Sequence, residues 1–190
     1  MAGYKYVIYE KEGNIARLTM NKPEKLNVYT FISRGEDAKE FYDALDQAAA
    51  DDNIKVVIIK GAGRSFSVGH DLTKVGFVYG FGTGQAGERR PSQRIRLAYD
   101  RIAMEDWMYK IFLHPKITVA QAHGYCIGGG LLILTLCDLA VCADDAVLGH
   151  TEQRLGFAGS GIPNMNVLIA TVGLKRAMDL LLTGRMIDGK

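Results

Sequence analysis

Residues 119–130 read VAQAHGYCIGGG and lead from a strand-like apolar run into three consecutive glycines. Glycine at the end of a strand lets a ligand approach the main chain and leaves amides free to point outward. The apolar stretch up to Leu136 predicts that the glycines open a helix, whose N-terminus favours developing negative charge. A plainer interpretation is that the triple glycine permits close packing of helix on sheet, and the residues of this stretch alone leave both open.

A second stretch has the same layout. Residues 56–72 read VVIIKGAGRSFSVGHDL, an aliphatic run followed by glycines and a polar turn. If one amide from each turn converged on a single oxygen, the two would form an oxyanion hole, in which each donor contributes about 3–4 kcal/mol.

Strand and helix patterns alternate along the rest of the chain and predict an α/β fold. The predicted strands cover residues 4–10, 14–20, 54–59, 117–122 and 138–143, and we expect 54–59 and 117–122 to be buried on both faces. The predicted helices cover residues 35–51, 92–113 and 128–136. Residues 76–91 carry five glycines and three aromatic residues, which favours a functional loop or lid.

Composition excludes several classes of protein. The chain has 190 residues, 48% of them hydrophobic, and a net charge of +2, which suits one domain and gives no broad electrostatic footprint for nucleic acid. No run approaches 18 uncharged apolar residues, so we expect no membrane span, and the N-terminus lacks the apolar stretch of a signal peptide. Three cysteines without suitably spaced histidines indicate reduced thiols and no metal site. We therefore expect a soluble cytoplasmic or organelle-matrix protein.

The ordered series of motifs resembles the crotonase (enoyl-CoA hydratase/isomerase) superfamily. The motifs that carry this resemblance are, in chain order, residues 21–27 (NKPEKLN), 65–72 (SFSVGHDL), 123–130 (HGYCIGGG), 137–143 (CDLAVCA), 149–152 (GHTE) and 155–156 (LG). The resemblance implies a spiral of ββα repeats with surrounding helices, as one domain over residues 1–190. It also implies a homotrimer or dimer of trimers, and further C-terminal helices beyond the segment at 184–188.

The same resemblance implies an acyl-CoA substrate and no separate cofactor, because coenzyme A belongs to the substrate. The two donor amides would be those of His70 and Gly129, and Lys25 would contact a CoA phosphate. The segment at 65–68 would lie near the CoA adenine. The full set expected to bind substrate is Lys25, Ser65, Phe66, Ser67, Val68, Asp71, Leu72 and Leu132.

Glu152 and Leu132 bear on the reaction. Hydratases of the family use two glutamates, and this chain has Glu152 at the second position but Leu132 at the first. Hydration needs a water held between two carboxylates, whereas moving one proton between carbons needs only one. Glu152 is therefore the expected catalytic acid and base, and isomerisation suits it best.

Other functions remain open at this level. His150 and Ser160 lie near the expected acyl site in sequence and would suit a thioester or C–C bond hydrolase on the same fold. A non-catalytic acyl-CoA-binding protein is the alternative from another class. Fold and oxyanion hole do not fix the reaction.

Overall fold

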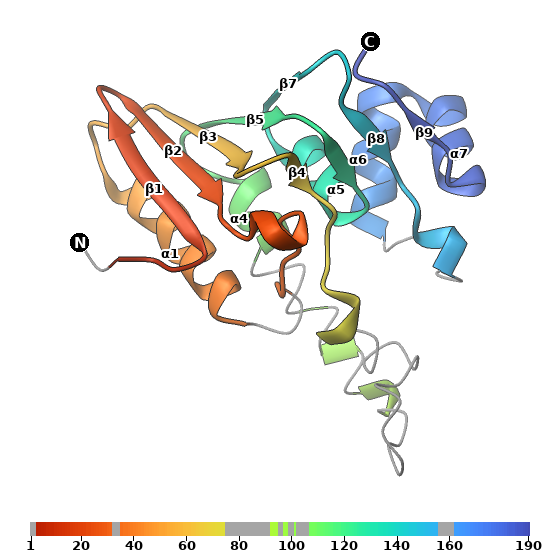
Figure 1. Ribbon diagram of the computed structural model, residues 1–190, viewed down its shortest axis with the longest axis horizontal. Coiled ribbons are helices and arrows are strands. Elements are labelled where there is room, and N and C mark those ends of the chain that lie inside the picture. Colours follow the sequence, from red (N-terminus) through yellow and green to blue (C-terminus); the bar gives the residue numbers. More distant parts are fainter. Residues whose placement is uncertain are drawn as a thin grey trace.

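The computed structural model describes residues 3–31, 35–74, 92–94, 97–98, 101, 107–155 and 162–190. Two sheets form the centre of the described part (Figure 1). The five-stranded sheet has the order β1-β2-β3-β5-β7, with strands Val7–Glu12, Ile15–Met20, Val56–Gly61, Ile117–Ala122 and Leu139–Cys142. The four-stranded sheet has the order β4-β6-β8-β9, with strands Ser65–Ser67, Tyr125–Ile127, Val147–Gly149 and Met186–Ile187.

Each turn of the chain places one strand in each sheet. β3 is followed by β4, β5 by β6, and β7 by β8, and each strand pairs in parallel with its counterpart in the next turn. Among the strand pairs of the described residues, only the β1–β2 hairpin and the β8–β9 pair are antiparallel. This arrangement confirms the predicted α/β spiral of ββα repeats.

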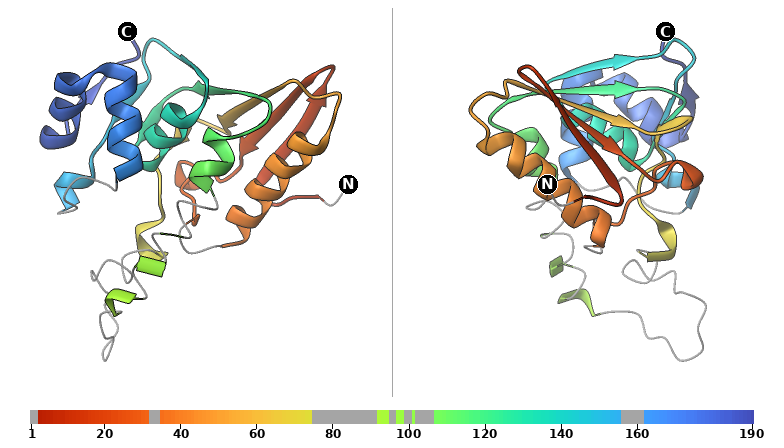
Figure 2. Two further views of the ribbon diagram at one scale, coloured as in Figure 1. Left: turned by 180° about the vertical axis from the view of Figure 1, so that it is seen from behind. Right: turned by 60° about the vertical axis from the view of Figure 1, so that its left-hand side comes forward.

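Helices surround the sheets (Figure 2). They are α1 (Glu36–Ala50), α4 (Tyr109–Phe112), α5 (Gly129–Leu136), α6 (Ile162–Val172) and α7 (Leu174–Thr183), with short 3-10 turns η1 (Pro23–Lys25) and η3 (Glu152–Leu155). Phe41 and Leu45 of α1 are buried in the main core. α1 and α5 pack on the five-stranded sheet. The regularly spaced apolar side chains from which α1 was predicted therefore face that sheet.

The prediction that residues 117–122 are buried on both faces is wrong. β5 alternates between buried and more exposed residues, and Ile117 is 52% exposed. On the neighbouring β7, Leu139 and Val141 are 59% and 60% exposed. β5 therefore covers the core on one face only, while β7, at the edge of the sheet, has no buried residue.

The first predicted strand begins three residues too early. The amides of Lys5 and Tyr6 donate to the carboxylate of Glu40 on α1, at 3.1 and 2.6 Å, so pairing with β2 begins only at Val7. The short strands β4, β6, β8 and β9 were not predicted, and neither were α6 and α7. The expected loop at 76–91 lies outside the described residues, as do residues 95–96, 99–100 and 102–106 of the expected helix and Ser160. Along the described residues, no helix combines the length and the apolar character that crossing a bilayer requires.

Candidate active site

The two glycine turns singled out in the sequence are in direct contact. A Cβ added to Gly69 would lie 2.7 Å from the amide nitrogen of Gly129. Gly69 follows β4 with φ +86°, and Gly128 precedes α5 with φ +57°. Both conformations favour glycine, so the close approach of the turns depends on these residues.

This geometry leaves two amides without an internal acceptor. Gly69 N–H donates to Ser67 Oγ at 3.1 Å and Asp71 N–H to Tyr29 O at 2.8 Å, whereas the His70 amide between them has no acceptor among the described residues. Gly128 N–H donates to Gly149 O at 2.8 Å, but the amide of Gly129 likewise has no described acceptor. Gly129 is the first residue of α5, where a helix offers its amide no partner.

Glu152 lies against Gly128, the residue that precedes the donor Gly129. Its Oε1 is 3.2 Å from the position a Cβ would take on Gly128. Its Oε2 lies 2.9 Å from Nδ1 of His150, whose side chain is only 5% exposed while that of Glu152 is 21% exposed. Burial alone would lower the pKa of His150, but its contacts with Glu152 and Gln153 outweigh burial and raise the pKa above its usual value. The contact with His150 thus holds the carboxylate at the start of α5.

The imidazole of His70 is a neutral group in this site. Its Nδ1 is buried without a hydrogen-bond partner among the described residues. Burial lowers the pKa of His70 to about 4, although the carboxylate of Glu152 acts in the opposite direction. The ring packs edge-on against Tyr29 and Trp107, with centroids 4.6 and 5.8 Å away.

The other residues expected to bind substrate fall into two groups. The side chains of Phe66, Ser65, Ser67 and Leu132 are buried, and the serine hydroxyls donate to the carbonyls of Tyr125 and Asn27. The more accessible ones are Val68, Asp71, Leu72 and Lys25. Ser65, Phe66 and Ser67 therefore offer a ligand only their main-chain atoms. Leu132 belongs to the core.

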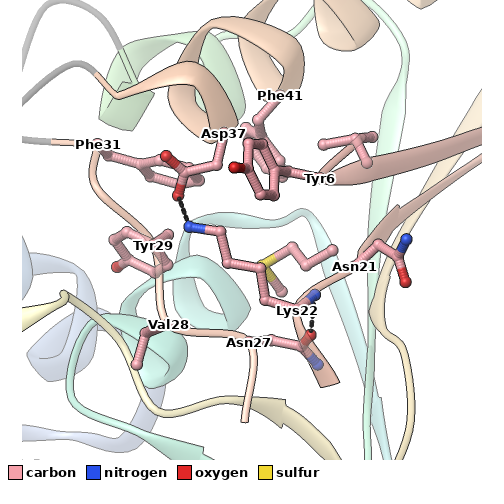
Figure 3. Close-up of a pocket in the computed structure, with 11 residues that line it drawn as sticks. Tyr6, Asn21, Lys22, Asn27, Val28, Tyr29, Phe31, Asp37 and Phe41 are labelled. Atoms are coloured by element: carbon pink, nitrogen blue, oxygen red, sulfur yellow. Dashed lines mark hydrogen bonds and ion pairs between the residues drawn. The ribbon is translucent and has the colours of Figure 1, made fainter. Parts of the chain in front are cut away.

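Lys25 and Asp71 line an open cleft of roughly 610 Å³ together with Lys74. Lys22 also lines this cleft. Its ammonium group pairs with Asp37 at 2.8 Å and its main-chain amide donates to Asn27, and Figure 3 shows both interactions in a second pocket that Lys22 lines. Lys25 and Lys74 have no ion pair among the described residues. Lys5 also lines the cleft and has no described ion pair, but its ammonium group lies over the ring of Tyr6. Lys25 and Lys74 are thus two cations of this cleft that are available to a phosphate.

Sequence reasoning missed Tyr29 and Lys74. Tyr29 lies in an irregular segment after η1 and is 2% exposed, and no motif or periodicity marks it. Lys74 is one surface lysine among many, and only the fold brings it to the cleft. Trp107 is fully buried against Tyr29 and His70. No group of three potential metal ligands occurs within the described ranges.

Comparison with known proteins supplies the family. The sequence model of the family described as "Enoyl-CoA hydratase/isomerase" matches residues 10–190. The chain belongs to the enoyl-CoA hydratase/isomerase (crotonase) family. Two curated relatives of this family member are a putative enoyl-CoA hydratase of Thermus thermophilus, 31% identical over 184 residues, and a hydroxycinnamoyl-CoA hydratase-lyase of Pseudomonas fluorescens, 30% identical over 188 residues.

The family member covers only part of these relatives. The alignments span 97% and 98% of this chain but 66% and 63% of the two relatives. The crystal structure of an enoyl-CoA hydratase/carnithine racemase from Magnetospirillum magneticum superimposes with a TM-score of 0.82 at 24% identity, over 98% of this chain and 64% of that one. That likeness confirms the crotonase fold.

Proposed function

We propose that this family member processes an acyl-CoA thioester by stabilising an enolate and moving one proton. The amides of His70 and Gly129 would donate to the thioester oxygen, and Glu152 would act as the acid and base. The observation that carries the proposal is the approach of Glu152 to Gly128, with Oε1 3.2 Å from the Cβ position, directly beside the Gly129 amide that has no described acceptor. A proton carrier and an oxyanion donor thus share one site.

The reaction that suits this site best is migration of a carbon–carbon double bond. Glu152 takes a proton from C2 of a 3-enoyl thioester, the electron pair delocalises onto the thioester oxygen, and the same carboxylic acid returns the proton at C4. The double bond moves from C3–C4 to C2–C3, and no atom is gained or lost. Leu132 supports this assignment because a buried aliphatic side chain offers no second group to activate water.

The cleft at Lys25 and Lys74 is the proposed site for the phosphates of coenzyme A. It also includes Asp71, the residue after the proposed donor His70. Lys25 and Lys74, which have no ion pair among the described residues, thus share a cleft with the chain neighbour of one proposed donor. Lys22 is a poorer candidate, because Asp37 already neutralises its charge.

Mass spectrometry on the full-length protein incubated with a panel of CoA esters tests this function. The account predicts that a 3-enoyl-CoA keeps its mass and changes its chromatographic retention. Release of free CoA would instead assign a thioester hydrolase, and binding without any conversion would assign a non-catalytic acyl-CoA-binding protein. Either result would overturn the isomerisation proposal.

Hydration is the second candidate, because the two curated relatives are named as a putative hydratase and a hydratase-lyase. In the same experiment, a 2-enoyl-CoA would gain the mass of one water. Assembly as a homotrimer or dimer of trimers also stays a prediction, and the exposed apolar side chains of Leu139 and Val141 support a covered face. Analytical ultracentrifugation tests it.

A further inference from the structure

Tyr29 is attached to the turn that carries His70. Its N–H donates to Gly69 O at 3.0 Å, and its carbonyl accepts from Asp71 N–H at 2.8 Å. These bonds involve the two residues that flank His70, so the main chain of Tyr29 runs directly beside the proposed donor. The position of its side chain is therefore tied to the geometry of that turn.

The hydroxyl of Tyr29 reaches the other donor. A Cβ added to Gly129 would lie 2.0 Å from Tyr29 Oη, which is closer than any real pair of nonbonded atoms. The phenol thus occupies the space that a side chain at position 129 would need. Oη therefore lies against the start of α5, next to one proposed amide donor.

This hydroxyl is buried and has no described partner. Tyr29 is 2% exposed, and Oη forms no hydrogen bond with any described residue. Leaving a buried hydroxyl unpaired costs about 1–3 kcal/mol. A ligand oxygen at this point would satisfy the group.

Aromatic contacts fix the orientation of the ring. Phe31 stacks on Tyr29 with centroids 3.9 Å apart, while His70 and Trp107 pack edge-on at 4.6 and 5.9 Å. Burial and the nearby carboxylate of Glu152 raise the pKa of Tyr29 well above its usual value. The side chain is consequently a rigid, neutral O–H donor, which needs no rearrangement when charge develops.

We propose that Tyr29 is a third donor of the oxyanion site, whose O–H bonds to the thioester oxygen together with the amides of His70 and Gly129. The inference rests on the function proposed above and adds a catalytic side chain to it. Because the phenol keeps its proton throughout, its role is to stabilise the enolate, while Glu152 moves the proton.

The variant Tyr29→Phe tests this role, since it keeps the ring and removes only the hydroxyl. In the full-length protein we expect kcat to fall about 100- to 1,000-fold, in line with the loss of one oxyanion donor, with little change in KM. The matched control is Tyr9→Phe, which removes another buried hydroxyl without a described partner, on β1. Tyr9→Phe should leave kcat unchanged.

A second readout does not depend on turnover. Acetoacetyl-CoA forms an enolate that absorbs in the near ultraviolet, and a protein that binds the oxyanion should lower the pH at which this band appears. We expect the wild type to lower it and Tyr29→Phe to lower it less. If the wild type lowers it and Tyr29→Phe lowers it equally, the role of Tyr29 is refuted while the oxyanion site stands. If the wild type itself has no effect, the proposed function fails first and the role of Tyr29 falls with it.

Thermal unfolding separates a functional hydroxyl from a structural one. Because the hydroxyl has no described partner, Tyr29→Phe should unfold at the same temperature as the wild type or higher. A lower unfolding temperature together with unchanged kcat would show that Tyr29 supports only the fold, and would overturn the proposal.

Discussion

His150 Nδ1 lies 2.9 Å from Glu152 Oε2, and both side chains follow β8 within one short turn. The imidazole is almost fully buried, so the pair is shielded from solvent on that side. We interpret His150 as a positioning residue, which holds the carboxylate beside Gly128.

Replacing His150 by Asn should lower kcat about tenfold, because Glu152 loses the contact that orients it.

The raised pKa of His150 predicts a pH dependence of stability as well. Protonated His150 stabilises the folded state below its unfolded pKa of about 6.5, and this contribution is lost as pH rises through the folded pKa. The difference in unfolding free energy between wild type and His150→Asn should therefore be larger at about pH 6 than at about pH 9.

Urea denaturation at the two pH values measures that difference. His114→Asn is the control, because the described partners of the His114 ring nitrogens are main-chain carbonyls and an amide away from the site. An equal stability difference at both pH values for His150→Asn would contradict the assignment of the ion pair.

His70 should show the opposite pH dependence. Its pKa is lowered to about 4 in the folded protein. As the pH falls, the unfolded chain is therefore protonated at this residue near pH 6.5, whereas the folded protein is protonated only near pH 4. Stability therefore falls as pH falls through this window, by about 3 kcal/mol in total. His70→Asn should abolish this part of the acid sensitivity in urea denaturation.

The same variant tests the main-chain role of position 70. His70→Asn keeps the amide, so kcat should stay within about threefold of the wild type. A loss as large as that expected for a missing donor would mean that the imidazole itself takes part in the reaction.

Gly69→Ala should abolish turnover, because the new methyl group would lie 2.7 Å from Gly129 N and cover that donor. Gly173→Ala is a matched control: Gly173 has φ +82° against +86° for Gly69, but nothing lies within 4 Å of its Cβ position. Both variants should lose about 1–3 kcal/mol of stability from backbone strain. Only Gly69→Ala should lose activity. Equal activity in the two variants would contradict the proposed role of the Gly129 amide as a donor.

Lys25→Ala should raise KM for a CoA ester about fivefold, the equivalent of roughly 1 kcal/mol, without changing kcat. The effect should weaken at high salt, since it is electrostatic. Lys175→Ala, on the exposed face of α7, is the control. For an N-acetylcysteamine thioester, which has no phosphates, wild type and Lys25→Ala should have the same KM, and a difference there would exclude a phosphate contact.

The two glycine turns of this site were predictable from the sequence, but the side chains around them were not. The glycine stretches around Gly69 and Gly128 are visible because close approach of main chains requires glycine. Glu152 followed only from the resemblance to a family, since an isolated glutamate carries no local signal. Tyr29 and Lys74 were missed because their importance arises from contacts between segments distant in the sequence, such as that of Tyr29 with Gly129.

The fold was predictable to a similar degree. The β1–β2 hairpin and α1 have clear apolar periodicity and β5 is a largely apolar run, whereas β4, β6 and β8 have three residues each, too few to establish a period. The misplaced start of the first strand has a tertiary cause, because Glu40 of α1 takes the amides that a longer strand would have used.

Glu152 is the group proposed to carry the proton. The most direct test measures the conversion of a 3-enoyl-CoA to its 2-enoyl isomer by full-length wild type and Glu152→Gln, with the affinity of each for the ester measured by calorimetry. The account predicts that Glu152→Gln is slower by about a hundredfold or more while its affinity stays close to that of the wild type. An unchanged rate in Glu152→Gln would contradict the account.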